Sequence, residues 1–271
     1  MISVLNSVSQ LQAENALSGT QASLQATLQQ LSTGLKINSG SDDAAGLSIA
    51  SGLGANISAL TQSSQNASNS VGLLQTADGA LSQVTSLLNR AVTLATEASN
   101  GGLTTDQATA ADTEYQSILK EITQIGSKTN FNGTAVFSAT PITTFTSDGT
   151  SGGTTTTSTT TGALSAASLL LTGDLTSVTD AATSLDAIST AIDTVSQTRG
   201  TIGASVNQLT ADENVENTQV TNLTSAQNNV QNADIGTVVA KMTQYNVLEQ
   251  TGMAALSQSN SAEQSVQKLL Q

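Results

Sequence analysis

The feature that most constrains the fold is a heptad register that runs without interruption near the C-terminal end. From Ile188 to Val230, one set of residues recurs at alternating steps of four and three. This spacing predicts a long helix that packs against another helix along a single seam. The register spans six heptads and contains four polar residues among its apolar ones, namely Arg199, Glu213, Glu216 and Gln227.

The N-terminal third shows the same spacing. A leucine seam predicts a first helix that ends at Asn38-Ser39-Gly40. A second seam, from Ile57 to Leu81 and with the polar residue Asp78 among its members, predicts a helix that reaches Glu97 and stops before Asn100-Gly101-Gly102. A third helix is expected to be capped by Thr105 or Asp106 and to end at Gly126.

The middle of the chain differs in character. Residues 131–145 contain all three phenylalanines and the single proline, and Asn132-Gly133 is a hairpin-turn signal, so short β-structure is predicted there. Residues 146–163 are rich in Thr, Ser and Gly and carry no large apolar side chain. This tract is therefore either an exposed hairpin or a flexible loop.

The composition supports a fold with thin cores. Apolar residues make up 37% of the chain and aromatic residues only 2%. Small aliphatic side chains suit seams between helices better than a thick globular core. We therefore expect a mainly α fold, in which long coiled-coil-like helices from both chain ends pack together around a small central β-hairpin or loop region.

The composition also excludes several functions. The chain has no His and no Cys, which removes the usual nucleophilic triads, His or Cys metal sites and disulfides. We expect no enzyme activity, no metal and no cofactor. The net charge of −13 disfavours nucleic-acid binding and docking on anionic membranes. No apolar run is long enough to predict membrane insertion, and the first ten residues do not resemble a cleaved signal peptide.

The charges are distributed unevenly. Residues 1–40 and residues 235–271 are each neutral, so the whole negative charge lies in residues 41–234. Neutral amphipathic ends can be buried in an assembly at a low desolvation cost, whereas an acidic middle stays in water. The pattern predicts a subunit that assembles through its ends. An ordinary intramolecular helix bundle remains an alternative explanation of the seams.

The expected assembly seams are formed by Leu17, Leu24, Leu28, Leu31, Leu35, Val247, Leu248, Leu256, Leu269 and Leu270. Ser41, Asp42 and Asp43 are expected to cap the second helix. A glycosidase-type use of the two aspartates is conceivable, but helix capping explains them better.

Several segments resemble bacterial flagellins. The sequence LSTGLKINSGSDDAAGLSIASGL, Leu31 to Leu53, is similar to the N-terminal motif of that family. The resemblance extends over about residues 1–137 and 181–271, in the same order along the chain. The other matching segments are Asn56 to Leu60, Gln75 to Leu81, Asn130 to Gly133, Val220 to Ala226, Gln250 to Leu256 and the final Leu269-Leu270.

The resemblance implies a structural subunit of the flagellar filament that serves swimming motility. It further implies export through the flagellar type III channel, an extracellular location, and contacts with other copies, hook-associated and cap proteins and an export chaperone. Residues 1–40 and 235–271 are then expected to form an inner terminal-helix domain. Residues 41–234 would form an outer helical domain with a β-hairpin region at about 129–175. About forty residues separate the matching parts, so a minimal flagellin without large outer domains is expected.

Two further expectations come from the same resemblance. Arg90, Leu94 and Glu114 match family positions that contact the innate immune receptor for flagellin, but Val92 and Thr93 depart from the stimulatory pattern, so weak or absent signalling is expected. The tract at 146–163 either carries O-linked glycans, as some flagellins do, or is unmodified.

Two alternative functions remain open at this point. One is a hook–filament junction protein of the same superfamily. The other is a secreted coiled-coil effector or adhesin, which would bind a host target without self-assembly.

Overall fold

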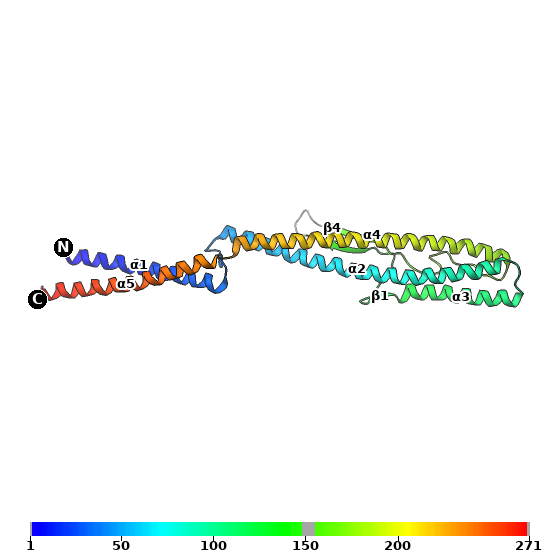
Figure 1. Ribbon diagram of the computed structural model, residues 1–271, viewed down its shortest axis with the longest axis horizontal. Coiled ribbons are helices and arrows are strands. Elements are labelled where there is room, and N and C mark those ends of the chain that lie inside the picture. Colours follow the sequence, from blue (N-terminus) through cyan, green and yellow to red (C-terminus); the bar gives the residue numbers. More distant parts are fainter. Residues whose placement is uncertain (1, 148–154, 270–271) are drawn as a thin grey trace. The chain divides into compact units, whose positions relative to one another are not determined.

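The computed structural model describes residues 2–147 and 155–269, and these form long helices with a small β-region between them (Figure 1). The helices are α1 (Ile2–Thr33), α2 (Ala44–Ser99), α3 (Thr105–Lys128), α4 (Val178–Gln231) and α5 (Ile235–Leu269). Between α3 and α4 lie the strands β1 (Asn130–Phe131), β2 (Thr134–Ala135), β3 (Ile142–Thr146) and β4 (Thr155–Thr159). The expected mainly α fold with a small central β-region is confirmed.

The chain divides into two compact units. Unit 1 comprises Met1–Ala55 and Asn222–Gln271, and unit 2 comprises Asn56–Thr221. Helix breaks are present near residues 40 and 234, since α2 begins at Ala44 and α5 begins at Ile235. The first helix, however, ends at Thr33 and not at Asn38, so Leu35 lies outside it, in a bridge with Asn232. The division between the units nevertheless falls inside α2 and α4, since both helices continue across it without a break.

Unit 1 is built on the pairing of α1 with α5, which lie side by side in Figure 1. The segments next to them are joined by backbone hydrogen bonds. The Lys36 N–H donates to the Gln231 carbonyl at 2.7 Å, and the Ala233 N–H donates to the Gly34 carbonyl at 2.9 Å. These bonds form a short antiparallel bridge between Leu35 and Asn232. The two chain ends are thus tied together where α1 ends and α5 begins.

Unit 2 contains the main hydrophobic core, along the seam between α2 and α4. In α2 the buried side chains recur every seventh residue from Leu60 to Leu88, and in α4 they do so from Ala181 to Glu216. α3 adds Tyr115, Ile118 and Ile122 to this core. A seven-residue recurrence of buried positions is the signature of helices packed along a seam, as the heptad register predicted.

Two of the polar residues in the predicted seams pair with each other. The guanidinium of Arg199 on α4 donates to both carboxylate oxygens of Asp78 on α2, at 2.7 and 3.3 Å. Further along, Ser64 on α2 meets Asn217 on α4 at 3.5 Å. Residues early in α2 thus face residues late in α4, so the two helices run antiparallel within unit 2.

The start and the end of α3 differ from the expectation. Its N-cap is Thr104, not Thr105 or Asp106, because the Thr104 hydroxyl accepts from the Gln107 N–H while the Gln107 side chain accepts from the Thr104 N–H. Gly126 does not end the helix, which continues to Lys128. Instead, Gly126 is buried against the backbone of Leu164, where a side chain would not fit.

The β-region consists of two small hairpins. Asn132 and Gly133, with φ values of 51° and 80°, connect β1 and β2 in the two-residue turn that their sequence predicted. β3 pairs with β4 in antiparallel register, with Phe145 opposite Thr156. The Thr-rich tract therefore supplies a strand, and residues 148–154 of that tract lie outside the described residues.

The β3–β4 hairpin buries polar side chains and exposes its phenylalanine. Its buried side chains are threonines, whereas Phe145 is 44% exposed. The buried face is held by hydroxyl groups: Thr144 donates to Ser70 of α2 at 2.6 Å, and Thr157 accepts from Gln208 of α4 at 3.5 Å. Hydrogen bonds therefore help to fix the hairpin to the helices, together with the packing of Ile142 against the core.

By length and composition alone, one described helix could cross a membrane. An 18-residue window of α2 reaches a mean hydropathy of 1.2, and 17% of that window is buried. A helix that lines the core of a soluble bundle meets the same criteria. Most of that window is not buried, however, and the α2 residues of the hydrophobic core begin only at Ala67, so core packing does not account for the apolar character of the window.

Candidate assembly surface

The turn before α2 is organised by the two adjacent aspartates. One carboxylate oxygen of Asp42 accepts from the N–H groups of Asn38 and Ser39, at 3.0 and 2.9 Å. These backbone hydrogen bonds lower the pKa of Asp42. Asp43 accepts from the Gly46 N–H at 2.9 Å and so occupies the capping position of α2. Ser41 bonds to the hydroxyl of Ser39 in the same turn.

A third aspartate, Asp234, plays the matching role before α5. It accepts from the Thr237 hydroxyl at 2.7 Å and from the Gly236 N–H at 3.0 Å, and these bonds lower its pKa. The sequence reasoning did not single out this residue. Its signal was present, because an aspartate immediately before an amphipathic run is a typical N-cap pattern.

The surface of α1 and α5 carries many apolar side chains. Of the thirteen large hydrophobic residues that are exposed in the described chain, eight lie on these two helices. They are Val8, Leu11, Leu28, Ile235, Val239, Val247, Leu248 and Met253, with exposures between 40% and 58%. The concentration of most of the exposed large apolar residues on these two helices makes their surface the candidate for contact with another molecule.

The predicted seam residues of the two ends occupy different environments. Leu17, Leu24, Leu31 and Leu35 are half-buried, as is Leu256. Leu17 faces Gly252 of α5, where there is little space for a larger residue. By contrast, Leu28, Val247 and Leu248 are exposed. Leu270 lies outside the described residues, and so does the side chain of Leu269.

The pairing of α1 and α5 has almost no interior of its own. Among the described side chains of these two helices, only Thr27 and Val238 are buried. One polar contact, from Gln21 to Glu249 at 3.3 Å, also crosses between them. Two helices alone cannot enclose a core, so this pair is complete only when other helices cover its apolar residues.

The three residues matched to receptor contacts lie on α2 and α3. The Arg90 guanidinium donates to both oxygens of the Glu114 carboxylate, at 2.7 and 3.0 Å. This pairing raises the pKa of Arg90 and lowers the pKa of Glu114. Both side chains are about half exposed, whereas Leu94 is 3% exposed and belongs to the core. A molecule that approaches this face therefore meets the ion pair and not Leu94.

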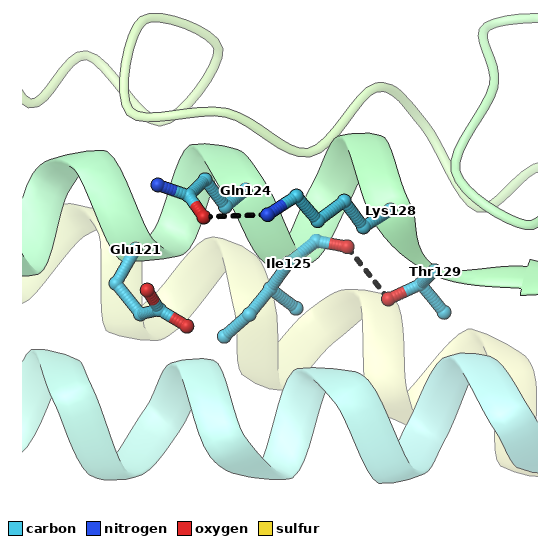
Figure 2. A pocket seen from close by; sticks show the side chains of 5 residues that line it. All are labelled: Glu121, Gln124, Ile125, Lys128 and Thr129. Atoms are coloured by element: carbon cyan, nitrogen blue, oxygen red, sulfur yellow. Dashed lines mark hydrogen bonds between the residues drawn. The ribbon is translucent and has the colours of Figure 1, made fainter.

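A hollow of about 280 Å³ runs along the end of α3 (Figure 2). Its lining is formed by Glu121, Gln124, Ile125, Lys128 and Thr129. Lys128 donates to the side-chain oxygen of Gln124 at 2.8 Å, and the Thr129 hydroxyl donates to the Ile125 carbonyl at 2.6 Å. The polar groups of this hollow are thus mainly engaged in local helix contacts.

Comparison with known proteins identifies the family. The bacterial flagellin N-terminal helical region matches residues 4–141, and the bacterial flagellin C-terminal helical region matches residues 185–270. The chain belongs to the bacterial flagellin family. The resemblance that its motifs indicated is confirmed. The N-terminal match covers α1 from residue 4 onward and the C-terminal match covers α5, and these two helices carry most of the exposed apolar residues.

Individual flagellins are similar over almost their whole length. The flagellin of Halalkalibacterium halodurans is 34% identical over 91% of this chain and 91% of its own length. The flagellin of Listeria monocytogenes is 31% identical over 89% of this chain and 90% of its own. The crystal structure of Bacillus cereus flagellin aligns with a TM-score of 0.51 and 29% identity, and the match covers 60% of this chain and 94% of that one. The size agrees with a flagellin of minimal type.

Proposed function

We propose that this chain is the structural subunit that polymerises into the bacterial flagellar filament. The observation that carries this proposal is the apolar, coreless pairing of α1 and α5 in a member of the flagellin family. A filament supplies the missing neighbours, because the same helices of other copies can cover these side chains. No observation favours a junction adapter or a secreted effector over the filament subunit.

The energetics of such an assembly follow from the distribution of charge and apolar surface. Fully burying one large aliphatic side chain contributes roughly 1.5–3 kcal/mol, so covering eight side chains that are about half exposed contributes roughly half of that value for each and together favours association. The two ends are each neutral, which keeps the cost of desolvation low. The acidic middle stays hydrated and repels non-specific partners.

The ends are also expected to fold when they assemble. Among the described side chains of residues 1–40 and 235–271, only Thr27, Ile37 and Val238 are buried, so in a dilute monomer these ends are predicted to be disordered and to be cleaved rapidly by proteases. Limited proteolysis followed by mass measurement of the fragments tests this prediction. Protease resistance of both ends in the dilute monomer would refute it.

The decisive experiment is seeded polymerisation observed by electron microscopy. Heat-dissociated monomer is expected to extend filament seeds into long uniform filaments. Replacing Leu11 and Val247 by glutamine should slow this growth at least about tenfold, because two apolar contacts are lost. The matched control Val215→Gln changes an equally exposed residue outside α1 and α5 and should grow normally. Monomers or short rings that never elongate would instead favour a junction adapter.

The remaining partners are proposed from family membership. We infer export through the flagellar type III channel to the cell exterior, contacts with hook-associated and cap proteins, and binding of an export chaperone to the C-terminal helix. Chaperone binding is supported by the exposed apolar residues of α5, which an unassembled subunit must shield. Co-purification of the chaperone with the full chain, but not with a chain that lacks residues 235–271, tests the last point.

Activation of the innate immune receptor is proposed to be weak. A receptor that binds at Arg90 and Glu114 must compete with the ion pair between them, and Leu94 is not accessible without repacking of the core. A receptor reporter assay with purified monomer should show little response. A full response at sub-nanomolar protein would overturn this expectation.

A further inference from the structure

Glu216 is a carboxylic acid at a position where the helix seam requires an apolar residue. The buried residues of α4 recur from Ile188 through Val195, Ile202 and Leu209, and the next one is Glu216. Its side chain is 6% exposed. The proposed assembly surface does not include this residue, since it belongs to α4 in unit 2 and not to α1 or α5.

The carboxyl group has one close partner. Its Oε1 atom lies 2.5 Å from the hydroxyl of Ser63 on α2, while Oε2 makes no hydrogen bond with any described residue. Ser63 is itself 1% exposed and connects the helix to the larger hairpin. Its hydroxyl accepts from the Ser147 N–H at 3.0 Å and lies 3.3 Å from the Phe145 carbonyl.

The protonation state of Glu216 decides which hydrogen bonds the Ser63 hydroxyl forms. A serine hydroxyl has one proton to donate, and Ser63 has two acceptors within reach, namely Glu216 and the Phe145 carbonyl. If Glu216 is ionised, the carboxylate takes the Ser63 proton, because hydrogen bonds to charged acceptors are stronger. If Glu216 is protonated, it donates to Ser63, and Ser63 is free to donate to Phe145.

The ionisable groups around Glu216 are acidic. On its own helix, Asp212 and Glu213 repel a negative charge at this position. On the packed elements, residues 56–72 of α2, β3 and β4 contain no ionisable side chain. Burial and the two neighbouring acids raise the pKa of Glu216 above its ordinary value. Asp148, the ionisable residue that follows β3 in the sequence, lies outside the described residues.

We propose that Glu216 is a proton-dependent latch that fastens the β3–β4 hairpin to α2 when it is protonated and loosens it when it is ionised. The step transfers one proton between the Glu216 carboxyl group and water, and the Ser63 hydroxyl turns from Phe145 to Glu216 as the proton leaves. Because the folded state binds this proton more tightly than the unfolded chain, the stability of unit 2 falls as the pH rises from the unfolded pKa through the folded one.

The test is amide hydrogen exchange of the β3 segment in the monomeric full chain. Exchange is measured for wild type and for Glu216→Gln at each pH from about 4 to about 8, and the ratio of the two rates cancels the intrinsic effect of pH. Glutamine can donate to Ser63 at every pH, as the protonated acid does. The ratio of wild type to variant should be near one in acid and rise to roughly fivefold at the alkaline end, which corresponds to the loss of one hydrogen bond.

Four further variants make the test specific. Glu121→Gln removes an exposed carboxylate from α3 and should keep the wild-type profile, as should Asp148→Asn. Ser63→Ala breaks the connection and should exchange rapidly at every pH, with no pH-dependent change relative to its own Glu216→Gln double variant. A constant ratio across the pH range would overturn the proposal, and so would an unchanged pH response in Ser63→Ala or its loss in Asp148→Asn. None of these measurements depends on filament growth.

Discussion

Replacing Gly126 by alanine provides a sharp test of how α3 is packed. In an exposed helix, this substitution stabilises a protein by up to about 1 kcal/mol, because alanine has the higher helix propensity. At Gly126, however, the new methyl carbon would lie 1.8 Å from the carbonyl oxygen of Leu164 and 2.7 Å from its carbonyl carbon. Ordinary contact distances are about 3.5 Å, so one of the two backbones must move by about 1.5 Å or more.

The segment that carries Leu164 cannot move freely. Leu164 belongs to the core of unit 2, and the neighbouring Ala166 N–H is held by the Thr123 hydroxyl of α3 at 3.2 Å. On the other side, the Thr161 hydroxyl donates to the Val136 carbonyl at 2.7 Å. Overpacking of a fixed site costs roughly 1–3 kcal/mol or more, which outweighs the gain in helix propensity. We therefore expect Gly126→Ala to destabilise the protein by about 2 kcal/mol net.

The assay is thermal unfolding of the monomeric full chain, followed by far-UV circular dichroism. A loss of about 2 kcal/mol lowers the midpoint by roughly 4–8 °C for a domain of this size. Gly79→Ala in α2 and Gly203→Ala in α4 are matched controls, because both positions are exposed and have no atom within 4 Å of the new methyl group. They should raise the midpoint slightly. A rise of similar size for Gly126→Ala would refute the close approach to Leu164.

Four other predictions concern polar groups. A double-mutant cycle of Asp78→Ala and Arg199→Ala, measured by urea unfolding, should give a coupling of about 0.5–1 kcal/mol that weakens at high salt, because both partners are partly exposed; a coupling independent of salt would contradict this. Glu216→Leu should stabilise unit 2 by about 1–3 kcal/mol. The gain should be larger at neutral than at acidic pH, because the pKa of Glu216 is raised and the ionised side chain is the costly one to bury. Destabilisation by this substitution would show that the Ser63 contact dominates. Thr104→Ala should cost about 1 kcal/mol in thermal unfolding and Thr104→Gly less; equal losses would argue against a capping role. Because the pKa of Asp42 is lowered, its contribution to stability is present above the unfolded pKa and is lost as the pH falls through the folded pKa. Acid titration followed by circular dichroism should therefore show a smaller acid-induced loss of stability for Asp42→Asn than for wild type.

The heptad register predicted the long helices and their buried positions because it depends only on spacing along one chain segment. The partners of the polar residues in the seams were not predictable in the same way. That Asp78 would meet Arg199, and Glu216 would meet Ser63, depends on how far one helix is shifted along the other. The apolar repeat allows several such shifts, since each heptad resembles the next.

Other differences arose where local signals compete with packing. Gly126 looked like a helix terminator, yet its role is to allow close contact with a distant backbone segment that the sequence does not reveal. In the assembly surface, the sequence identified apolar seams at both ends. It could not show that Leu17 is half-buried while Val247 is exposed, because this depends on which face of α1 meets α5. The coverage of the exposed face by other copies stays a prediction.

The threonine-lined underside of the β3–β4 hairpin has a calorimetric consequence. Exposure of apolar surface raises the heat capacity of a protein, whereas exposure of polar surface lowers it. Detachment of a hairpin whose buried side chains are threonines should therefore leave almost no heat-capacity signature. A scanning calorimeter would record the melting of the helical seams but would not detect the detachment of the hairpin. Exchange of the amide hydrogens of β3 would report that detachment clearly.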